Sequence, residues 1–474
     1  MLAVAGACTL APKFLAGEAS GQGQAVNVTR LYNDTCAKCH GVEGQGGGAG
    51  TRTLLTDAKF SQDLDRPFFD AIKNGVPDQG MEAYGPTMRD EEVWAMVVHI
   101  RELQAKALRA AKGSTKPVDG VVKTQRHSYR IEEVVGTGQG LKVPWGVDWL
   151  PDGRMLVTNR PGTMFVFDKG ASVPVEGLPE TIENGQGGLM EVAVHPGFAR
   201  NGWIYLGITD PGKDGNPRSS MTKIVRGKLQ FVDGKALWNS QETIYEAAKE
   251  FYSGAGVHYG TRIVFDGKGH VFFVVGERGT NMRAQDPATP YGKIMRVMED
   301  GRIPDDNPVK GNPMWSLGHR NPQGLVFGLD GVLWDTEHGP RGGDEFNKID
   351  KGANYGWPVI AFSINYNDSP FRMPWPTADE KFAMPTFRWL PSCAACGLDV
   401  AKGPAFPNWK GDLFAGGLAG QNVDRIRVKD GKFVEREEIL HGMGRVRDVA
   451  VAPDGAIVVV LNDPDKIIRL VPAD

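Results

Sequence analysis

The chain has 474 residues, 41% hydrophobic and 23% charged, so it is long enough for at least two folded domains with sizeable cores. Its 54 basic and 57 acidic residues give a formal net charge of -3, which excludes the broad basic field that draws a protein to nucleic acid or anionic lipid. No stretch approaches the roughly 20 consecutive apolar residues of a membrane-spanning helix.

Residues 1–24 are predicted to be a separate, signal-like or disordered N-terminus. The opening MLAVAGACTL is apolar, with small residues before Cys8, and looks like the end of a secretory signal whose basic start is missing. We therefore expect an exported, periplasmic protein, with Cys8 as a candidate for lipid attachment.

A C-x-x-C-H motif, formed by Cys36, Cys39 and His40, lies in a first predicted domain of residues 25–112. Two cysteines at this spacing suit thioether bonds to haem, and the adjoining histidine supplies the proximal nitrogen to the iron. Met81 lies in a loop where its thioether could reach the sixth iron position, and Met88 is the competing ligand. The motif therefore predicts a covalently bound haem c.

A long amphipathic helix is predicted at the end of this domain. Thr87 and Asp90 have the spacing of a capping box, and Gly113 is expected to end the helix. The apolar face comprises Val93, Met96, Val97, Ile100 and Leu103. From the haem motif to this helix the chain resembles class I cytochrome c domains, except that Glu82 follows the ligand methionine where proline is usual.

Residues 113–127 read as a polar linker, and residues 128–474 as a second domain in which one phrase recurs: a turn with glycine, an alternating strand and a polar tip. The phrase begins at Leu150, Asn201, Asp266, Leu329, Lys410 and Pro453. Six occurrences with loops of varied length predict a six-bladed β-propeller. The expected fold is therefore mainly β, a propeller preceded by a small all-α cytochrome c domain, with the polar tips converging at one end of a channel.

Four polar stretches in the second domain carry candidate site residues. They are NGQGGLMEVAVHP with Gln186, GVHYGTRIVF with His258, SLGHRNPQGLVF with Arg320 and Asn321, and GMGRVRDVAVAPDG with Arg445 and Arg447. His258 lies beside a glycine-rich turn, and an imidazole can act as a general base near neutral pH.

The segments GQGGL, HYGTRIVFDG, GERG, GHRNPQGL, EHGPRGGDE, NYGWP and GRVRDV, in that order, resemble the soluble quinoprotein aldose and glucose dehydrogenases, six-bladed propellers that bind pyrroloquinoline quinone (PQQ). The resemblance covers residues from about 130 to 474. It implies that His258 takes the proton from the anomeric hydroxyl of an aldose, or a related sugar aldehyde or alcohol, while hydride leaves the same carbon for the quinone.

The resemblance also implies how the quinone is bound. Arg320, Arg445 and Arg447 would contact its three carboxylates in a bidentate manner that lysine cannot reproduce. Gln186 and Asn321 would hydrogen-bond to the ring oxygens.

Two calcium sites are implied by the same resemblance. The backbone carbonyls of Gly339 and Pro340 would hold one ion against the quinone, since oxygen ligands suit a hard cation. Glu345 and the Tyr355 carbonyl would form part of a second, structural site, in which Asn365 stands where a carboxylate is expected.

Two further positions depart from the family pattern. Glu277 in GERG stands where the family has an aspartate that orients the catalytic histidine, and we expect the longer side chain to accept the same hydrogen bond. Ala419 occupies the place of a cofactor-binding lysine, which leaves Gln421 as an uncharged substitute.

Cys393 and Cys396 remain after the haem cysteines. In an exported protein this pair suits a short-loop disulfide, and the alternatives are two free thiols or half of a metal site. We expect His195 to cap a blade turn and His338 to brace the carbonyl pair. We expect five tryptophans to pack in the core or between blades, with stacking on a sugar face as the alternative for one near the channel: Trp145, Trp149, Trp315, Trp334 and Trp357.

The sequence thus predicts a quinohaemoprotein sugar dehydrogenase that passes electrons one at a time from the quinone to the fused haem, and onward to a respiratory acceptor. Fusion replaces a diffusional encounter by an intramolecular one. One alternative is a calcium-dependent lactonase-type hydrolase, because propellers host that chemistry too. The other is a non-catalytic propeller that binds a partner and carries a cytochrome.

Overall fold

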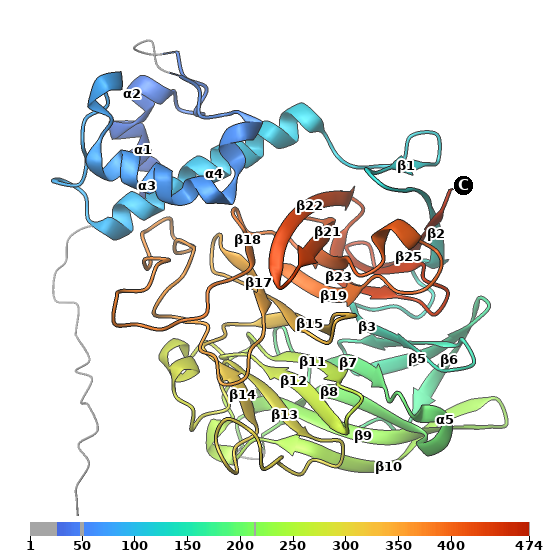
Figure 1. Cartoon of the computed structure of the whole chain (residues 1–474). Helices are drawn as coiled ribbons and strands as arrows, with labels where there is room; N and C mark the ends of the chain where they lie inside the picture. Colours follow the sequence, from blue (N-terminus) through green and yellow to red (C-terminus); the bar gives the residue numbers. More distant parts are fainter. Residues whose placement is uncertain (1–25, 48–51, 213–214, 474) are drawn as a thin grey trace, which may run out of the picture.

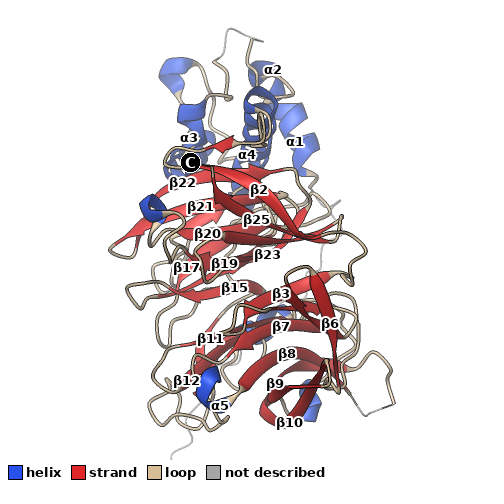
Figure 2. Ribbon diagram, turned by 90° about the vertical axis from the view of Figure 1, so that its right-hand side faces the viewer, coloured by secondary structure: helices blue, strands red, loops and turns tan. Residues whose placement is uncertain are grey.

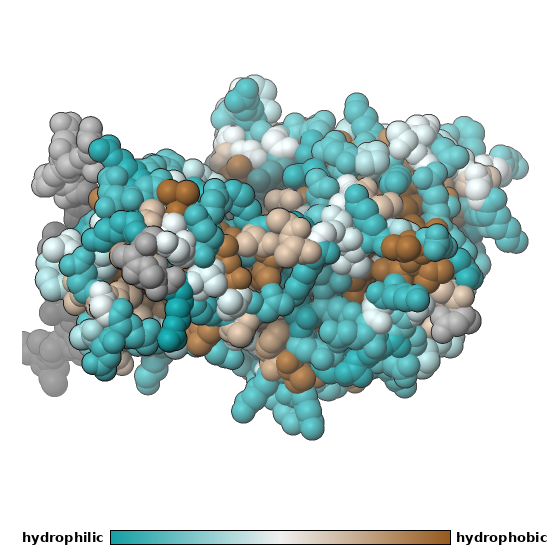
Figure 3. Space-filling model, turned by 90° about the horizontal axis from the view of Figure 1, so that it is seen from above, coloured by the Kyte–Doolittle hydropathy of each residue, from teal (hydrophilic) through white to brown (hydrophobic). Residues whose placement is uncertain are grey.

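The computed structural model describes residues 26–47, 52–212 and 215–473. A small helical domain sits against one end of a larger β domain, and the same division is visible after a quarter turn (Figures 1 and 2). From above, the surface is mostly hydrophilic with several separate hydrophobic patches (Figure 3). The predicted N-terminal signal and Cys8 lie outside the described residues.

The helical domain contains α1 (Val28–Thr35), α2 (Ala37–His40), α3 (Asp65–Asn74) and α4 (Asp90–Lys112), with short 3-10 turns at Asp57–Phe60, Gln62–Leu64 and Pro77–Gln79. The predicted terminal helix is α4, which ends at Gly113 with a φ of 70°, a conformation that favours glycine. Of its predicted apolar face, Val93, Met96, Val97 and Ile100 are buried, and Leu103 packs against the same core.

The predicted start of α4 is wrong by two residues. The Glu92 carboxylate accepts the backbone N–H of Arg89 at 2.8 Å and closes the first turn, whereas the Thr87 hydroxyl donates to the Tyr84 carbonyl at 3.2 Å. Thr87 belongs to the preceding turn because its hydroxyl is used there, and Glu92 is the acidic residue that can reach back to an unpaired amide.

The described strands form five sheets. One sheet joins the two ends of the β domain and contains β1 (Val122–Lys123), β2 (Ser128–Val135), β23 (Arg445–Val451), β24 (Ile457–Asn462) and β25 (Lys466–Pro472). An eight-stranded sheet consists of two antiparallel runs joined by a parallel β6–β10 pair: β3 (Pro144–Trp149), β4 (Met155–Asn159), β5 (Thr163–Asp168), β6 (Ala171–Glu176), β7 (Leu189–Val194), β8 (Trp203–Pro211), β9 (Ser220–Val232) and β10 (Lys235–Glu246). A short helix, α5 (Phe198–Asn201), precedes β8.

The other three sheets are antiparallel and four-stranded. The first has β11 (Gly260–Phe265), β12 (His270–Val275), β13 (Lys293–Met298) and β14 (Met314–Leu317). The second has β15 (Pro322–Phe327), β16 (Leu333–Glu337), β17 (Asp344–Lys348) and β18 (Phe387–Trp389). The third has β19 (Ala395–Val400), β20 (Leu413–Gly417), β21 (Asn422–Lys429) and β22 (Lys432–His441).

The recurring phrase of the sequence corresponds to every fourth strand. Its six copies contain β4, β8, β12, β16, β20 and β24. The strand before each of these, β3, β7, β11, β15, β19 and β23, contacts the next one in that order, and β23 contacts β3. These first strands lie in the middle of the β domain while β10, β14 and β22 lie at its outside (Figure 1). The fold is mainly β and propeller-like.

The segment predicted as a linker is tied to the β domain. Within it, β1 pairs with β2, and the His441 backbone N–H donates to the Thr115 carbonyl at 2.9 Å. Residues 113–127 therefore run along β22 and β2. Among the helices of the described residues, none is long and apolar enough to cross a membrane.

The disulfide predicted between Cys393 and Cys396 is absent, and both residues are buried free thiols. Ala394 turns the chain with a φ of 55°, β19 begins at the next residue, and the Cys396 thiol donates to the Val446 carbonyl of β23 at 2.7 Å. Cys393 packs instead in the core around Trp389 and Trp334. The two side chains thus serve different contacts, and the free-thiol alternative holds.

Candidate active site

The candidate residues meet because of where they stand in their hairpins. In antiparallel pairs the start of one strand faces the end of the next: Gly260 of β11 pairs with Val275 of β12, and Pro322 of β15 pairs with Glu337 of β16. His258 therefore comes beside Glu277, and Asn321 comes beside His338, whose backbone N–H donates to the Asn321 carbonyl at 3.3 Å. The Glu277 N–H donates to the Arg320 carbonyl at 2.9 Å and joins the two hairpins.

His258 is held by two hydrogen bonds and lies in a constrained turn. Its Nδ1 hydrogen-bonds to Glu277 Oε1, and its backbone N–H donates to Gln186 Oε1 at 2.9 Å. Its φ of 52° is a conformation that non-glycine residues rarely adopt, as is common in constrained functional turns. Burial, followed by the positive charges of Arg320 and Arg278, lowers the pKa of His258 below its usual value despite the neighbouring Glu277. The imidazole is therefore neutral near pH 7 and can accept a proton.

Glu277 makes the contact expected of the shorter aspartate. Its side chain is fully buried, and its second oxygen, Oε2, accepts the backbone N–H of Asn281 at 2.6 Å. Burial raises the pKa of Glu277, but the hydrogen bonds from His258 and Asn281 outweigh it and leave the pKa below the usual range. A charged carboxylate therefore fixes His258 Nδ1 as the donor and leaves Nε2 available for substrate.

Arg320 lies on the other side of this pair. Its Nη1 donates to the carbonyls of His338 at 3.2 Å and Gly339 at 3.0 Å, and its guanidinium lies 5.3 Å from the centre of the Trp357 ring. Trp357 thus contributes a cation–π contact beyond the packing role that the sequence predicted. The residue is 7% exposed, and its Nε has no hydrogen-bond partner.

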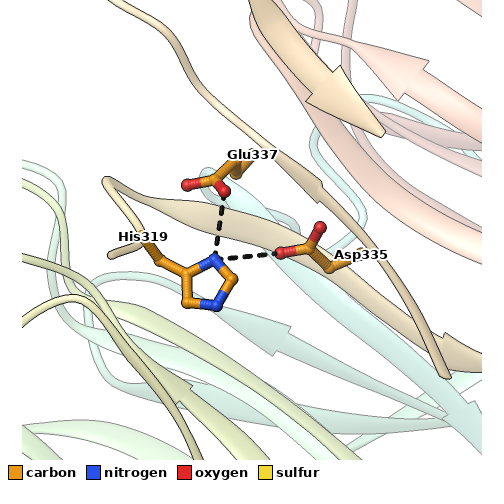
Figure 4. Close-up of side chains that lie close together, drawn as sticks. All are labelled: His319, Asp335 and Glu337. Atoms are coloured by element: carbon orange, nitrogen blue, oxygen red, sulfur yellow. Dashed lines mark hydrogen bonds and ion pairs between the residues drawn. The ribbon is translucent and has the colours of Figure 1, made fainter. Parts of the chain in front are cut away.

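A buried His–Glu pair, His319 and Glu337, lies close to Asp335 (Figure 4) and contacts the backbone of Arg320. Glu337 Oε2 accepts the Arg320 backbone N–H at 2.7 Å, and Glu337 Oε1 lies 3.0 Å from His319 Nδ1. Asp335 adds a third group, with Oδ2 3.8 Å from His319 Nδ1, and burial raises its pKa well above the usual range. The ligand atoms of these three residues lie within 4.8 Å of one another, which is compatible with a bound cation.

Arg447 and Asn321 are linked through Gln323. Arg447 Nη1 donates to Gln323 Oε1 at 3.2 Å, and Gln323 Nε2 donates to Asn321 Oδ1 at 3.2 Å. Burial is the largest of the effects that lower the pKa of Arg447 to about 10. The positive charges of nearby arginines also lower it, whereas the neighbouring Cys396 raises it. The Arg447 guanidinium lies 5.7 Å from the ring centre of Trp145. A half-buried arginine with a buried Nε is therefore held here with few hydrogen-bond partners.

Three buried polar atoms in this region lack partners: Arg320 Nε, Arg447 Nε and His338 Nε2. Burial and then the charges of Arg320, Arg447 and His258 lower the pKa of His338 well below its usual value, which places all of these groups around one imidazole. Unpaired buried donors and two guanidinium groups favour an anionic, oxygen-rich ligand.

Two of the predicted binding residues are not brought into this group. The Arg445 side chain is 42% exposed and faces Asp463, with 3.9 Å between Nε and Oδ2. Gln421 is exposed with a φ of 49°, and its backbone carbonyl accepts the Gly442 N–H at 2.8 Å. Arg445 still lies near enough to help lower the pKa of Arg447.

The predicted calcium ligand Gly339 is a well-fixed turn residue. Its N–H donates to Asp344 Oδ1 at 2.9 Å while its carbonyl accepts from Arg320. The neighbouring Pro340 is buried. Asp344 also accepts the Ser392 hydroxyl at 2.8 Å and the Ala395 N–H at 2.9 Å, so it ties this turn to the start of β19.

The residues predicted for a second calcium site make other contacts in the structure. Glu345 lies in β17, where Asn347 Nδ2 donates to its Oε2 at 3.3 Å, and burial followed by Glu337 raises its pKa well above the usual range. Tyr355 stacks on His319 with 4.6 Å between ring centres. Asn365 donates instead to Ser369 Oγ at 3.0 Å and to the Pro370 carbonyl at 2.8 Å, within its own loop.

The haem-motif residues face the predicted methionine ligand. Cys36 is the N-cap of α2 and His40 ends the helix, while the backbone of Met81 pairs with Val76. Cys36 and Met81 pack against one core, and Lys38 Nζ lies 3.3 Å from Glu82 Oε1. His40 Nδ1 is buried without a partner, whereas Met88 is 7% exposed and packed in the core.

Sequence reasoning missed two residues that position the site, Glu337 and Asp344. Both stand in the EHGPRGGDE segment, but only the fold shows that their carboxylates accept the backbone N–H groups of Arg320 and Gly339. The acidic character of this segment was a usable signal, because acidic residues beside glycine-rich turns often accept turn amides.

Comparisons with known proteins agree with these observations. A family model described as glucose/sorbosone dehydrogenase matches residues 141–469, and one described as cytochrome c oxidase, cbb3-type, subunit III matches residues 23–100. The aldose sugar dehydrogenase YliI of Escherichia coli is 37% identical over 332 residues, which cover 68% of this chain and 87% of the relative.

Two solved structures extend the likeness to the fold. The soluble aldose sugar dehydrogenase of E. coli in the apo form is 34% identical, with a TM-score of 0.65. The match covers 73% of this chain and 99% of the E. coli chain. The PQQ-bound aldose sugar dehydrogenase of Streptomyces coelicolor is 26% identical, with a TM-score of 0.59. The match covers 72% of this chain and 98% of the S. coelicolor chain. This chain therefore belongs to the glucose/sorbosone dehydrogenase family and carries a cytochrome c domain ahead of that region.

Proposed function

We propose that this protein is a quinohaemoprotein that oxidises aldoses, or related sugar aldehydes and alcohols, at the anomeric carbon with PQQ and passes the electrons to its own haem c. The observation that carries the proposal is the pairing of a neutral, carboxylate-anchored His258 with two arginines, Arg320 and Arg447, whose buried Nε atoms lack hydrogen-bond partners. The closed order of the six first strands supports a six-bladed propeller with this group at one end of its channel.

The residues fit the quinone. Its carboxylates would satisfy the Arg320 and Arg447 guanidinium groups, and Asn321 and Gln186 would contact its ring oxygens. Bound PQQ supplies an electrophilic carbonyl carbon that accepts hydride. His258 Nε2 would take the proton of the anomeric hydroxyl, while Glu277 stabilises the imidazolium that forms.

Arg445 and Gln421 would contribute only after side-chain rearrangement. Calcium is proposed at the carbonyls of Gly339 and Pro340, and a second ion at Glu345 and Tyr355. No step is assigned to either ion, because the Gly339 carbonyl already accepts a hydrogen bond from Arg320.

In the helical domain, Cys36 and Cys39 would hold the haem through thioethers, with His40 and Met81 as iron ligands. The buried, unpartnered ring nitrogen of His40 and the placement of Met81 on the same core support this assignment. We further propose an exported, periplasmic protein with a respiratory acceptor downstream of the haem.

The test is sugar-driven reduction of the haem. Purified protein is supplied with PQQ and calcium, an aldose is added, and the haem absorption bands are followed. We expect His258→Ala to lose this reduction while dithionite still reduces the haem. The control is His270→Ala, which should behave as wild type because His270 begins β12, whereas His258 lies near the other end of that strand. Sugar-driven reduction that persists without His258 would remove it from its role. Hydrolysis of a lactone without haem reduction would favour the hydrolase, and neither activity would favour a binding module.

A further inference from the structure

The turn that follows β16 touches both domains. On the dehydrogenase side, the Gly339 carbonyl accepts Arg320 Nη1 at 3.0 Å. Two residues later, Arg341 forms a bidentate ion pair with Glu102 of α4, with 2.9 Å both from Nε to Oε1 and from Nη2 to Oε2. Parallel contacts of this kind fix orientation as well as distance. A residue of the candidate site and a helix of the cytochrome domain are thus joined through three consecutive residues.

Arg341 also anchors the start of the cytochrome domain. Its Nη1 lies 2.8 Å from Asp368 Oδ1. The Asp368 carbonyl accepts the Val28 N–H at 2.8 Å, and its Oδ2 accepts the Thr29 N–H at 3.1 Å, both at the first turn of α1. The first and last helices of the domain therefore converge on one arginine.

Apolar contacts seal the same junction. Arg341 exchanges backbone hydrogen bonds with Ile364, which is fully buried in the core of the cytochrome domain. In that core the Phe362 ring lies 6.0 Å from the Trp94 ring of α4. A Cβ at Gly342 would lie 3.5 Å from Val98 Cγ1, so the backbone of the turn comes directly against the helix.

From Glu102, contacts continue to the haem motif. His99 Nδ1 lies 4.0 Å from Glu102 Oε2, and the His99 ring centre lies 4.7 Å from that of Tyr32. The Tyr32 hydroxyl donates to the carbonyl of Gly41, the residue after His40, at 3.0 Å. Tyr32 is fully buried and His99 is 6% exposed, so this run of contacts excludes water.

We propose that the Gly339–Arg341 turn is the junction across which electrons pass between the two domains, and that Glu102 is a positioning residue that docks the cytochrome domain on it. The inference rests on the proposed function, which supplies the reductant, reduced PQQ, and the oxidant, the iron(III) of haem c. Each crossing moves one electron and yields iron(II). Before the second crossing the iron(II) gives its electron to the downstream one-electron acceptor named in the proposed function. Two crossings then reoxidise the quinone, and its two protons are released to solvent.

The test compares two isosteric variants that each remove one interdomain ion pair. Glu102→Gln breaks the pair at the turn, and Glu438→Gln breaks the pair between β22 and Arg109, whose Nη1 lies 2.8 Å from Oε1, elsewhere on the interface. In rapid mixing with sugar, we expect haem reduction to slow by about tenfold in Glu102→Gln, because the bidentate ion pair fixes both the distance and the orientation of the cytochrome domain at the turn. Glu438→Gln should match wild type, and sugar oxidation with a soluble dye as acceptor should be unchanged in both.

Amide hydrogen exchange provides a readout that needs no activity. Val28, Thr29 and Ile364 should exchange faster in Glu102→Gln than in wild type or in Glu438→Gln. Unchanged haem reduction in Glu102→Gln would overturn the junction. If wild type shows no dye-linked sugar oxidation, the proposed function fails, whatever the junction does. The docking role of Glu102 is judged separately by amide exchange, and unchanged exchange in Glu102→Gln would overturn it.

Discussion

His258, the proposed general base, shows how an imidazole is kept neutral beside two arginines. Burial and two arginines destabilise the imidazolium, whereas Glu277 stabilises it, and the balance leaves the pKa below the usual value. Since the neutral form is the one that accepts a proton, activity should fall only as the pH drops through this lowered pKa. The acid limb of kcat/KM should therefore lie below about pH 6.5.

The variant Glu277→Gln tests this balance. Glu277 is the group that raises the pKa of His258, so its loss should move the acid limb to still lower pH. The rate at neutral pH should fall by about 100-fold, because no carboxylate then fixes Nδ1 as the donor. The measurement is dye-linked kcat/KM against pH, with Glu277→Asp as the matched control that keeps the charge. An acid limb that stays in place or rises in Glu277→Gln would contradict the assignment.

At the scale of elements, the sequence predicted those strands and helices whose position is set by a local hydrophobic repeat or by an adjacent turn. The glycine turn followed by an alternating strand identified β4, β8, β12, β16, β20 and β24, because that pattern is local. The register that brings Glu277 beside His258 comes from hairpin pairing, and the resemblance, more than the pattern, predicted it.

What the sequence could not show depends on contacts between distant segments. Cys393 and Cys396 have the spacing of a disulfide, but the thiol of Cys396 is used by β23, some 50 residues away in the chain. The start of α4 was misplaced because Thr87 has a nearer acceptor in Tyr84. The role of Asp344 depends on Ser392 and Ala395, which reach it only after folding.

Asp344→Asn is the prediction at this scale. Asp344 accepts hydrogen bonds from Gly339, Ser392 and Ala395, and an amide in its place offers one acceptor oxygen while turning its NH2 group toward a donor. We expect a loss of about 2 kcal/mol in the free energy of unfolding. Urea titration gives the value, and Asp350→Asn, near the far end of the same hairpin and exposed, should change it by less than about 0.5 kcal/mol. Equal effects in the two variants would show that Asp344 does not hold the turn.

On the scale of the whole molecule, the two domains share a core and a buried ion network. Phe362 and Ile364 of the β domain belong to the hydrophobic cluster of the cytochrome domain. Asp65 of α3 is 2% exposed and binds two arginines, with 2.7 Å from Arg101 Nε and 3.0 Å from Arg388 Nε, the latter just before Trp389 at the end of β18. Apolar and ionic contacts of this extent should make the domains unfold together.

Asp65→Asn should uncouple them. The substitution keeps the shape of the side chain but leaves the buried guanidinium of Arg101 and the partly buried one of Arg388 without a counter-charge. Removing one partner of a buried pair costs about 3 kcal/mol. In a denaturant titration, the haem absorption and the tryptophan fluorescence of wild type should change at one midpoint, whereas in Asp65→Asn the haem signal should change first. Asp70→Asn, on the same helix and paired with Arg66 at the surface, should keep a single midpoint. Two separate midpoints in wild type would mean that the shared core does not couple the domains, whereas a single midpoint in Asp65→Asn would mean that the apolar contacts around Phe362 suffice without the ion network.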